Sequence, residues 1–163
     1  MRHKGKHLCR EPTHSTILEV DAAQSAVNEN RRELLGHIGF DFLATLIHIV
    51  EDDAAVRDSL ELFLESHGFE VETFESGREL SDAGSPQCSC LILDINLPGE
   101  TGFEVLERLR RNGQRAPAIF MSGRAGPDAR ARAAKAHAVA FFDKPVPPNE
   151  LLAAVKSATG HMP

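Results

Sequence analysis

The sequence predicts an α/β fold in which five strand–helix units build one open parallel sheet. From Leu46 onward, short apolar runs of strand length alternate with segments of helical periodicity, which is typical of βαβ units. Acidic, hydroxyl and basic residues stand where these apolar runs end. A chain of 163 residues, 42% of them hydrophobic, has the size and apolar content for one such domain with a tail.

The first part of the pattern predicts two strands and two helices. Leu46–Val50 is a mostly apolar run and predicts the first strand. Ala54–His67 predicts a helix that Gly68 ends. Phe69–Phe74 is less apolar and predicts a strand at the sheet edge, and Ser76–Ser81 predicts a short helix before a loop at 84–86. The apolar face of the first helix consists of Val56, Leu60, Phe63 and Leu64.

The middle of the pattern predicts the most buried strand and the helix that follows it. Leu91–Asp94 has the most apolar sequence of the predicted strands. Thr101 is a predicted N-cap for a helix over Gly102–Asn112, and Gly113 ends that helix. Ala118–Met121 is apolar throughout and predicts the fourth strand.

The last part of the pattern completes the five units. Pro127 is expected in the first turn of an Ala- and Arg-rich helix that reaches about Ala136. Val139–Phe142 predicts the fifth strand. Pro148 can open a final helix that ends near Gly160.

These elements place the domain at residues 45–160. Residues 1–44 are predicted to be an N-terminal tail, weakly helical or disordered, because their apolar stripe is weak. Residues 161–163 are expected to be a short C-terminal tail. Whether the N-terminal tail is a partner-binding arm or an upstream stretch added by a mistaken start site stays open.

Charge and composition argue against nucleic-acid and membrane binding. Residues 1–44 contain as many basic as acidic residues, so residues 45–163 carry the whole net charge of −6. Affinity for a phosphate backbone comes mainly from Lys and Arg, so direct nucleic-acid binding is not expected. No apolar run approaches the ~20 residues that cross a bilayer, and no apolar signal segment follows the cationic N-terminus. We therefore expect a cytoplasmic protein.

The polar residues at the strand ends are the candidate functional residues. In an open α/β sheet, ligands bind beyond the carboxyl ends of the strands, where the strand order reverses. Glu51 and Asp52 follow the first strand, Asp94 ends the third, Ser122 follows the fourth and Lys144 follows the fifth. In a sheet of order 2-1-3-4-5, the first and third strands are neighbours. The three carboxylates are then expected to meet in one pocket.

An all-oxygen cluster of carboxylates selects a hard cation, and an incomplete cage fits Mg²⁺ that keeps some of its waters. Lys144 supplies a positive charge for a phosphoryl oxygen and Ser122 supplies a hydroxyl donor. An aspartate can accept a phosphoryl group, because this transfer needs mainly positioning and charge neutralisation. Asp53 directly precedes a helix and is interpreted as its N-cap rather than as a metal ligand.

Four segments carry these residues: Ile49–Asp53, Leu91–Pro98, Phe120–Gly123 and Phe141–Pro145. In order and spacing they resemble the motifs of CheY-like receiver domains, over roughly 46–159. The resemblance implies a flavodoxin-like (βα)₅ doubly wound parallel sheet of strand order 2-1-3-4-5. It also implies a response regulator of a two-component system or phosphorelay, similar to receivers of the helix-turn-helix transcription-regulator subfamily. No such output domain is recognised, so a single-domain regulator is expected.

The resemblance assigns roles to the acidic residues. Asp94 matches the aspartate that becomes phosphorylated. Asp52 matches the metal-binding acid and Glu51 its acidic neighbour, at a position where Asp is usual. The backbone carbonyl of Asn96 matches a further Mg²⁺ ligand, and Asp94 itself is expected to bind the ion.

The resemblance also assigns switch residues. Ser122 matches the switch hydroxyl, Lys144 the phosphate-binding lysine, and Phe141 the aromatic residue that changes rotamer on activation. His137 stands where receivers often have a glycine in the left-handed conformation. A group of cationic residues on the fourth predicted helix is either a solvated face or part of a docking surface next to Phe141. This group comprises Arg130, Arg132 and Lys135.

The implied partners are a histidine kinase or a histidine phosphotransfer protein, together with an unknown output protein. A dimer that forms on phosphorylation stays open. The chain is expected to assist its own phosphoryl transfer and dephosphorylation rather than to act as an enzyme. Two alternatives are the receiver half of a transcription regulator that has lost its DNA-binding domain, and a phosphatase of the haloacid-dehalogenase type. The phosphatase is disfavoured because its nucleophile precedes its acidic pair and because Asn96 replaces its general acid.

Overall fold

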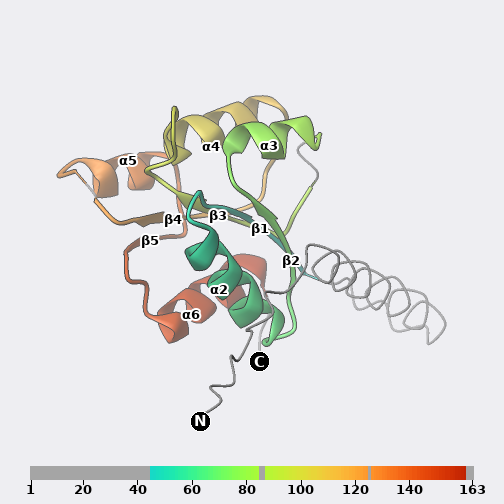
Figure 1. The fold of residues 1–163 in the computed structure, drawn as a ribbon. Coiled ribbons are helices and arrows are strands. Elements are labelled where there is room, and N and C mark those ends of the chain that lie inside the picture. Colours follow the sequence, from blue (N-terminus) through green and yellow to red (C-terminus); the bar gives the residue numbers. More distant parts are fainter. Residues whose placement is uncertain (1–44, 85–86, 125, 161–163) are drawn as a thin grey trace, which may run out of the picture. The chain divides into compact units, whose positions relative to one another are not determined.

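The computed structural model describes residues 45–84, 87–124 and 126–160. Their strands form one parallel sheet in the order β2-β1-β3-β4-β5 (Figure 1). The predicted strand order is therefore confirmed, and the second strand lies at a sheet edge as expected. The strands are β1 (Leu46–Val50), β2 (Glu70–Phe74), β3 (Cys90–Asp94), β4 (Ala118–Ser122) and β5 (Ala140–Asp143).

Helices cover both faces of this sheet. In the described residues they are α2 (Ala54–Glu65), α3 (Gly77–Asp82), α4 (Gly102–Arg111), α5 (Ala129–Lys135) and α6 (Pro148–Thr159). The pair α2 and α6 lies on one face, and α3, α4 and α5 lie on the other (Figure 1). This arrangement confirms the predicted doubly wound (βα)₅ fold. None of these helices combines the length and the apolar character needed to cross a bilayer.

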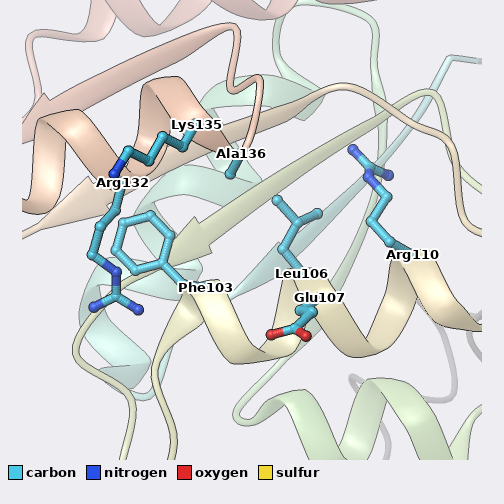
Figure 2. Close-up of a pocket in the computed structure, with 7 residues that line it drawn as sticks. All are labelled: Phe103, Leu106, Glu107, Arg110, Arg132, Lys135 and Ala136. Atoms are coloured by element: carbon cyan, nitrogen blue, oxygen red, sulfur yellow. The ribbon is translucent and has the colours of Figure 1, made fainter.

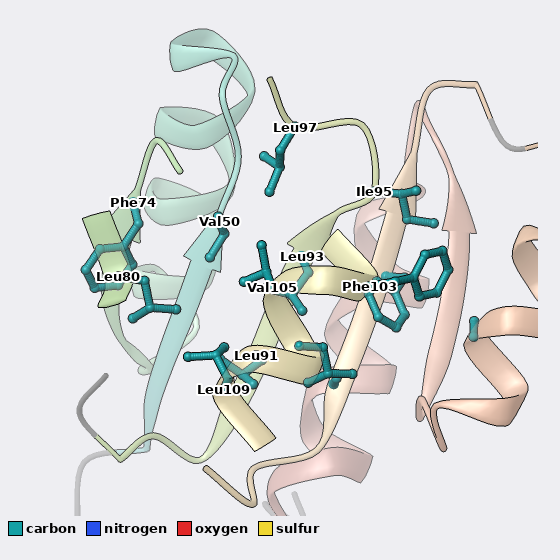
Figure 3. Close-up of a cluster of buried hydrophobic side chains, with 14 of the residues drawn as sticks. Val50, Phe74, Leu80, Leu91, Leu93, Ile95, Leu97, Phe103, Val105 and Leu109 are labelled. Atoms are coloured by element: carbon teal, nitrogen blue, oxygen red, sulfur yellow. The ribbon is translucent and has the colours of Figure 1, made fainter. Parts of the chain in front are cut away.

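The core consists of two apolar layers, one on each face of the sheet. Because successive side chains of a strand point to opposite faces, Leu91 and Leu93 of β3 pack toward α3 and α4, while Ile92 packs toward α2 and α6. Figure 3 shows the first of these layers. Every residue of β3 and β4 is buried. The ends of these two strands are therefore held by packing on both sides.

Some element bounds differ from the predicted ones, and α5 differs most. Pro127 is not in its first turn, because α5 begins at Ala129. The Ala129 amide donates to the Gly126 carbonyl (3.0 Å), so Pro127 lies at the second position of a turn that its fixed φ favours. His137 adopts the left-handed conformation, with a φ of 54°, as expected. The predicted tails at 1–44 and 161–163, and residues 85–86 of the predicted loop, lie outside the described residues.

Candidate functional site

The candidate residues lie together beyond the carboxyl ends of the central strands. Glu51 and Asp52 follow β1, and Asp94 ends β3, which pairs with β1 through Val50 and Leu93. Ligand oxygens of Glu51, Asp52 and Asp94 all lie within 4.8 Å of one another. The structure thus brings together the three acids that the sequence singled out.

Lys144 connects two of these acids. Its Nζ lies 2.7 and 2.6 Å from the two carboxylate oxygens of Glu51 and 2.8 Å from Asp94 Oδ2. Its backbone amide donates to the Ser122 carbonyl (2.8 Å), which ties the end of β5 to the end of β4. Burial lowers the pKa of the Lys144 ammonium, but the hydrogen bonds to Asp94 and Glu51 outweigh this and raise the pKa overall. The lysine is therefore charged at neutral pH.

The carboxylates outnumber the cations at this site. Glu51 is fully buried and Asp94 nearly so, whereas Asp52 is exposed. Burial raises the pKa of the Glu51 carboxyl, and the neighbouring Asp94 raises it further, although Lys144 acts in the opposite direction. The cluster thus has three carboxyl groups but one ammonium group, which contacts Glu51 and Asp94. An all-oxygen set with excess negative charge fits a hard divalent cation such as Mg²⁺.

Contacts with the start of α2 position Glu51 and Asp52 at the end of β1. Asp53 caps α2, because its Oδ1 accepts from the amides of Ala55 (2.9 Å) and Val56 (3.2 Å). This confirms its interpretation as an N-cap and leaves Asp52 free to face solvent. Arg57, one turn into α2, donates from its guanidinium to the Glu51 carbonyl (2.8 Å). This contact is not predictable from the sequence, since an arginine in a polar stretch carries no signal of its backbone partner.

The first residue of helix α4 packs closely against the backbone of Asp94. The Gly102 amide donates to the Ile95 carbonyl (3.1 Å), and a Cβ on Gly102 would lie 2.2 Å from the Asp94 carbonyl oxygen. Thr101 and Glu104 form a reciprocal capping box, with Thr101 Oγ1 accepting from the Glu104 amide (3.3 Å) and Glu104 Oε2 accepting from the Thr101 amide (2.7 Å). The predicted N-cap is confirmed. Gly102 is a positioning residue that the sequence analysis did not identify.

We predict that Gly102→Ala destabilises the domain by about 2 kcal/mol, because the new methyl group meets main-chain atoms that cannot move without moving Asp94. Urea unfolding measures this change. Gly123→Ala is the matched control, since a Cβ there meets nothing within 4 Å. Equal unfolding midpoints for the two variants would show that α4 can shift away from Asp94 without cost.

The predicted switch residues lie on the neighbouring strands. The Asn96 side-chain amide donates to Ser122 Oγ (2.9 Å), and the Asn96 backbone amide donates to Asp94 Oδ1 (3.2 Å). Ser122 is buried at the end of β4. Phe141 on β5 is half-buried, and the guanidinium of Arg130 lies 4.7 Å from its ring centroid. Arg130 also pairs with Asp143, so it contacts two residues of β5 although its own side chain stays mostly exposed.

Comparison with known proteins identifies the family. Residues 47–156 match the sequence profile of the family described as Response regulator receiver domain. The chain belongs to this family. The receiver is similar to the Response regulator protein TodT of Pseudomonas putida, with 40% identity over 116 residues that cover 71% of the chain and 51% of TodT. It is also similar to the Transcriptional regulatory protein FixJ of Bradyrhizobium diazoefficiens, with 36% identity over 114 residues covering 69% of the chain and 55% of FixJ.

Solved structures agree with this assignment. A CheY-like response regulator receiver domain protein from Methanospirillum hungatei JF-1 superposes with a TM-score of 0.65 at 32% identity, covering 72% of the receiver chain and 94% of that structure. The crystal structure of FixJ-N superposes with a TM-score of 0.64 at 30% identity, covering 72% of the receiver chain and 95% of that structure. The receiver spans about half the length of the curated relatives that it matches. Family membership gives no support to the alternative of a haloacid-dehalogenase-type phosphatase.

Proposed function

We propose that Asp94 accepts a phosphoryl group from a histidine kinase or a histidine phosphotransfer protein, in a reaction that depends on Mg²⁺. The observation that carries this proposal is the position of the Asp94 carboxylate. It is buried at the strand ends, lies 2.8 Å from Lys144 Nζ, and is within reach of the oxygens of two further acids. A carboxylate in this setting can be a nucleophile, since the neighbouring charges neutralise the incoming phosphoryl oxygens.

In the proposed step, one carboxylate oxygen of Asp94 attacks the phosphorus of the donor phosphohistidine. The new P–O bond forms as the P–N bond breaks, and the electron pair of that bond stays on the imidazole nitrogen. The Lys144 ammonium group, which now contacts carboxylates only, then also contacts one phosphoryl oxygen. The Ser122 hydroxyl donates a hydrogen bond to another. Mg²⁺ bound here would supply further charge neutralisation, and Glu51, Asp52, Asp94 and the backbone carbonyl of Asn96 are the groups proposed to hold it.

In the proposed signalling step, phosphorylation of Asp94 changes the position of Ser122 and then that of Phe141. Reorientation of the Ser122 hydroxyl toward the phosphoryl group breaks its hydrogen bond with Asn96, and the ring of Phe141 is proposed to turn inward in response. The output partner is proposed to be a separate protein or domain. A transcription regulator is the second candidate for the whole system, because relatives such as FixJ are named transcriptional regulatory proteins and are about half covered by the chain.

The test of the proposed function is phosphorylation by a small-molecule donor. After incubation with acetyl phosphate and Mg²⁺, intact-protein mass spectrometry is expected to show one added phosphoryl group, which hydroxylamine removes because an acyl phosphate reacts with it. Absence of the adduct, or an adduct that survives hydroxylamine, would contradict the proposal.

We predict that Mg²⁺ raises the thermal stability of the receiver through Asp52. A ligand at about ten times its Kd stabilises the native state by roughly 1.4 kcal/mol, which differential scanning calorimetry resolves. Asp52→Ala is expected to remove most of this gain, because Asp52 is the exposed acid of the cluster.

The neighbouring residue provides the control for this experiment. Asp53→Ala removes the two capping hydrogen bonds of α2 and is expected to cost about 1 kcal/mol, but the Mg²⁺-dependent gain should be unchanged. A full gain in Asp52→Ala, or a lost gain in Asp53→Ala, would place the cation elsewhere.

A further inference from the structure

A groove of about 400 Å³ lies between α4 and α5 (Figure 2), and none of the residues that line it belongs to the candidate site. Its apolar lining is formed by Phe103 and Leu106 of α4 and by Ala136 at the end of α5. The remaining lining residues are charged, and three of the four are cations. They are Glu107, Arg110, Arg132 and Lys135. On a chain whose net charge is −6, this groove carries a local excess of positive charge.

Neutral groups hold these cations in place. The guanidinium of Arg110 donates to the carbonyls of Gln114 (2.9 Å) and Ala116 (2.6 Å). The guanidinium of Arg132 lies 4.3 Å from the ring centroid of Phe103. Lys135 forms no ion pair within the part of the chain that the structure describes. Carbonyls and an aromatic ring orient a cation without cancelling its charge, and Glu107 in the groove and Glu104 near Arg132 offset only part of the three positive charges.

The walls of the groove are connected to the phosphorylation site. Helix α4 begins at Gly102, which packs against the Asp94 carbonyl, and α5 follows the loop that leaves Ser122. The ring of Phe103 also contacts Phe120 of β4, with 4.5 Å between centroids, two residues before Ser122. Each strand end is therefore linked by direct contacts to one wall of the groove.

We propose that this groove docks an amphipathic helix of the output partner, with apolar side chains on one face and acidic side chains beside them. A cleft between two helices with an apolar floor accepts the apolar face of a third helix, through anchors spaced i, i+3 or i+4, and i+7. The acidic residues pair with Arg132 and Lys135 at the rim. The affinity rises when Asp94 is phosphorylated, and this part rests on the proposed function.

The docking is tested with a displayed library of helical peptides that share a Leu and Phe stripe and have Glu or Lys at the flanking positions. Selection on the full chain is expected to enrich Glu. The double variant Arg132→Glu/Lys135→Glu should bind the selected peptides about tenfold more weakly, or about 1.4 kcal/mol, and should itself select Lys. The control Arg78→Glu/Lys156→Glu reverses two charges on other helices, α3 and α6, and should bind as the unaltered chain does.

Three results would overturn the docking proposal. The first is selection without enrichment of Glu, or unchanged peptide affinity in Arg132→Glu/Lys135→Glu. The second is equally tight competition by a DNA oligonucleotide, which would make a nucleic acid the occupant. The third is a dimer in sedimentation that the same double variant abolishes, which would make a second copy of the chain the occupant.

The coupling is tested with beryllofluoride, a mimic of the phosphoryl group, in the presence of Mg²⁺. Peptide affinity should rise at least about fivefold in the unaltered chain and should not change in Asp94→Asn. Unchanged affinity in a chain that binds beryllofluoride would overturn the coupling alone. A chain that does not bind beryllofluoride would overturn the coupling together with the proposed function, while the selection of Glu-containing peptides is decided independently.

Discussion

Asp94→Asn is expected to take no phosphoryl group from acetyl phosphate while keeping the fold. The amide has nearly the same shape as the carboxylate but is not a nucleophile. Its carbonyl oxygen can still accept from the Asn96 amide, as Asp94 Oδ1 does now at 3.2 Å. The lost contact with Lys144 is offset in part by the loss of repulsion between Asp94 and Glu51, and Lys144 keeps both oxygens of Glu51. The far-ultraviolet circular dichroism spectrum and the unfolding midpoint should stay close to those of the unaltered chain.

The measurement is intact-protein mass spectrometry, followed by peptide mapping after borohydride trapping of the acyl phosphate. Asp128→Asn is the matched control, because Asp128 is an exposed aspartate whose side chain makes no capping bond to α5. It should be phosphorylated as fully as the unaltered chain. A phosphoryl group on another residue of Asp94→Asn would show that Asp94 is not the acceptor.

The fold was predictable because local and long-range signals agree. The apolar runs that predict strands become β1, β3 and β4, and their polar ends meet because carboxyl ends of parallel strands share one edge of the sheet. The capping residues Asp53 and Thr101 were also recognisable, since each directly precedes a helix and has the side chain that accepts from its first amides.

Other features were not predictable because they depend on distances between segments far apart in the sequence. The contact of Lys144 with Glu51 joins residues 93 positions apart. No local sequence pattern predicts that this ammonium group contacts both Glu51 and Asp94. The role of Gly102 depends on how closely α4 approaches the Asp94 carbonyl. The stacking of Arg130 on Phe141 depends on how α5 lies against β5. Such contacts are set by packing geometry, which the residue types alone do not specify.

The site also shows a balance between stability and function. Two of its acids are buried, and burial of a carboxylate without a compensating charge is costly. Lys144 compensates them in the resting receiver, and it is the same group that the proposed reaction needs for the phosphoryl oxygen. The charge that the proposed reaction requires therefore also stabilises the fold of the receiver.

This balance predicts that Lys144→Met is strongly destabilising. The thioether chain fills a similar volume, but it leaves Glu51 and Asp94 buried without the ammonium group that now lies 2.6 to 2.8 Å from their oxygens. Removing one partner of a buried ion pair costs about 3 kcal/mol. Urea unfolding at neutral pH measures the loss, and Lys135→Met is the control, because Lys135 is exposed and should change stability by less than about 0.5 kcal/mol.

The stability lost in Lys144→Met is expected to depend on pH. The pKa of Glu51 is already raised by burial, and without Lys144 it is raised further. A carboxyl whose pKa is higher in the folded than in the unfolded state destabilises the fold at pH values above its folded pKa, and this penalty disappears as the pH falls toward the unfolded value of 4.5. In the unaltered chain, the raised pKa of Lys144 contributes stability that is present below its ordinary value of 10.5 and lost as the pH rises through the folded value.

The free-energy difference between Lys144→Met and the unaltered chain should therefore be larger at pH 7 than near pH 4.5, because the Glu51 part of the penalty disappears in acid. Adding Glu51→Gln to Lys144→Met removes one of the two uncompensated carboxylates, so it should restore a large part of the lost stability at pH 7 while having little effect in acid. A difference that stays constant with pH, together with no recovery in the double variant, would mean that Lys144 stabilises the receiver through its aliphatic packing and not through its charge.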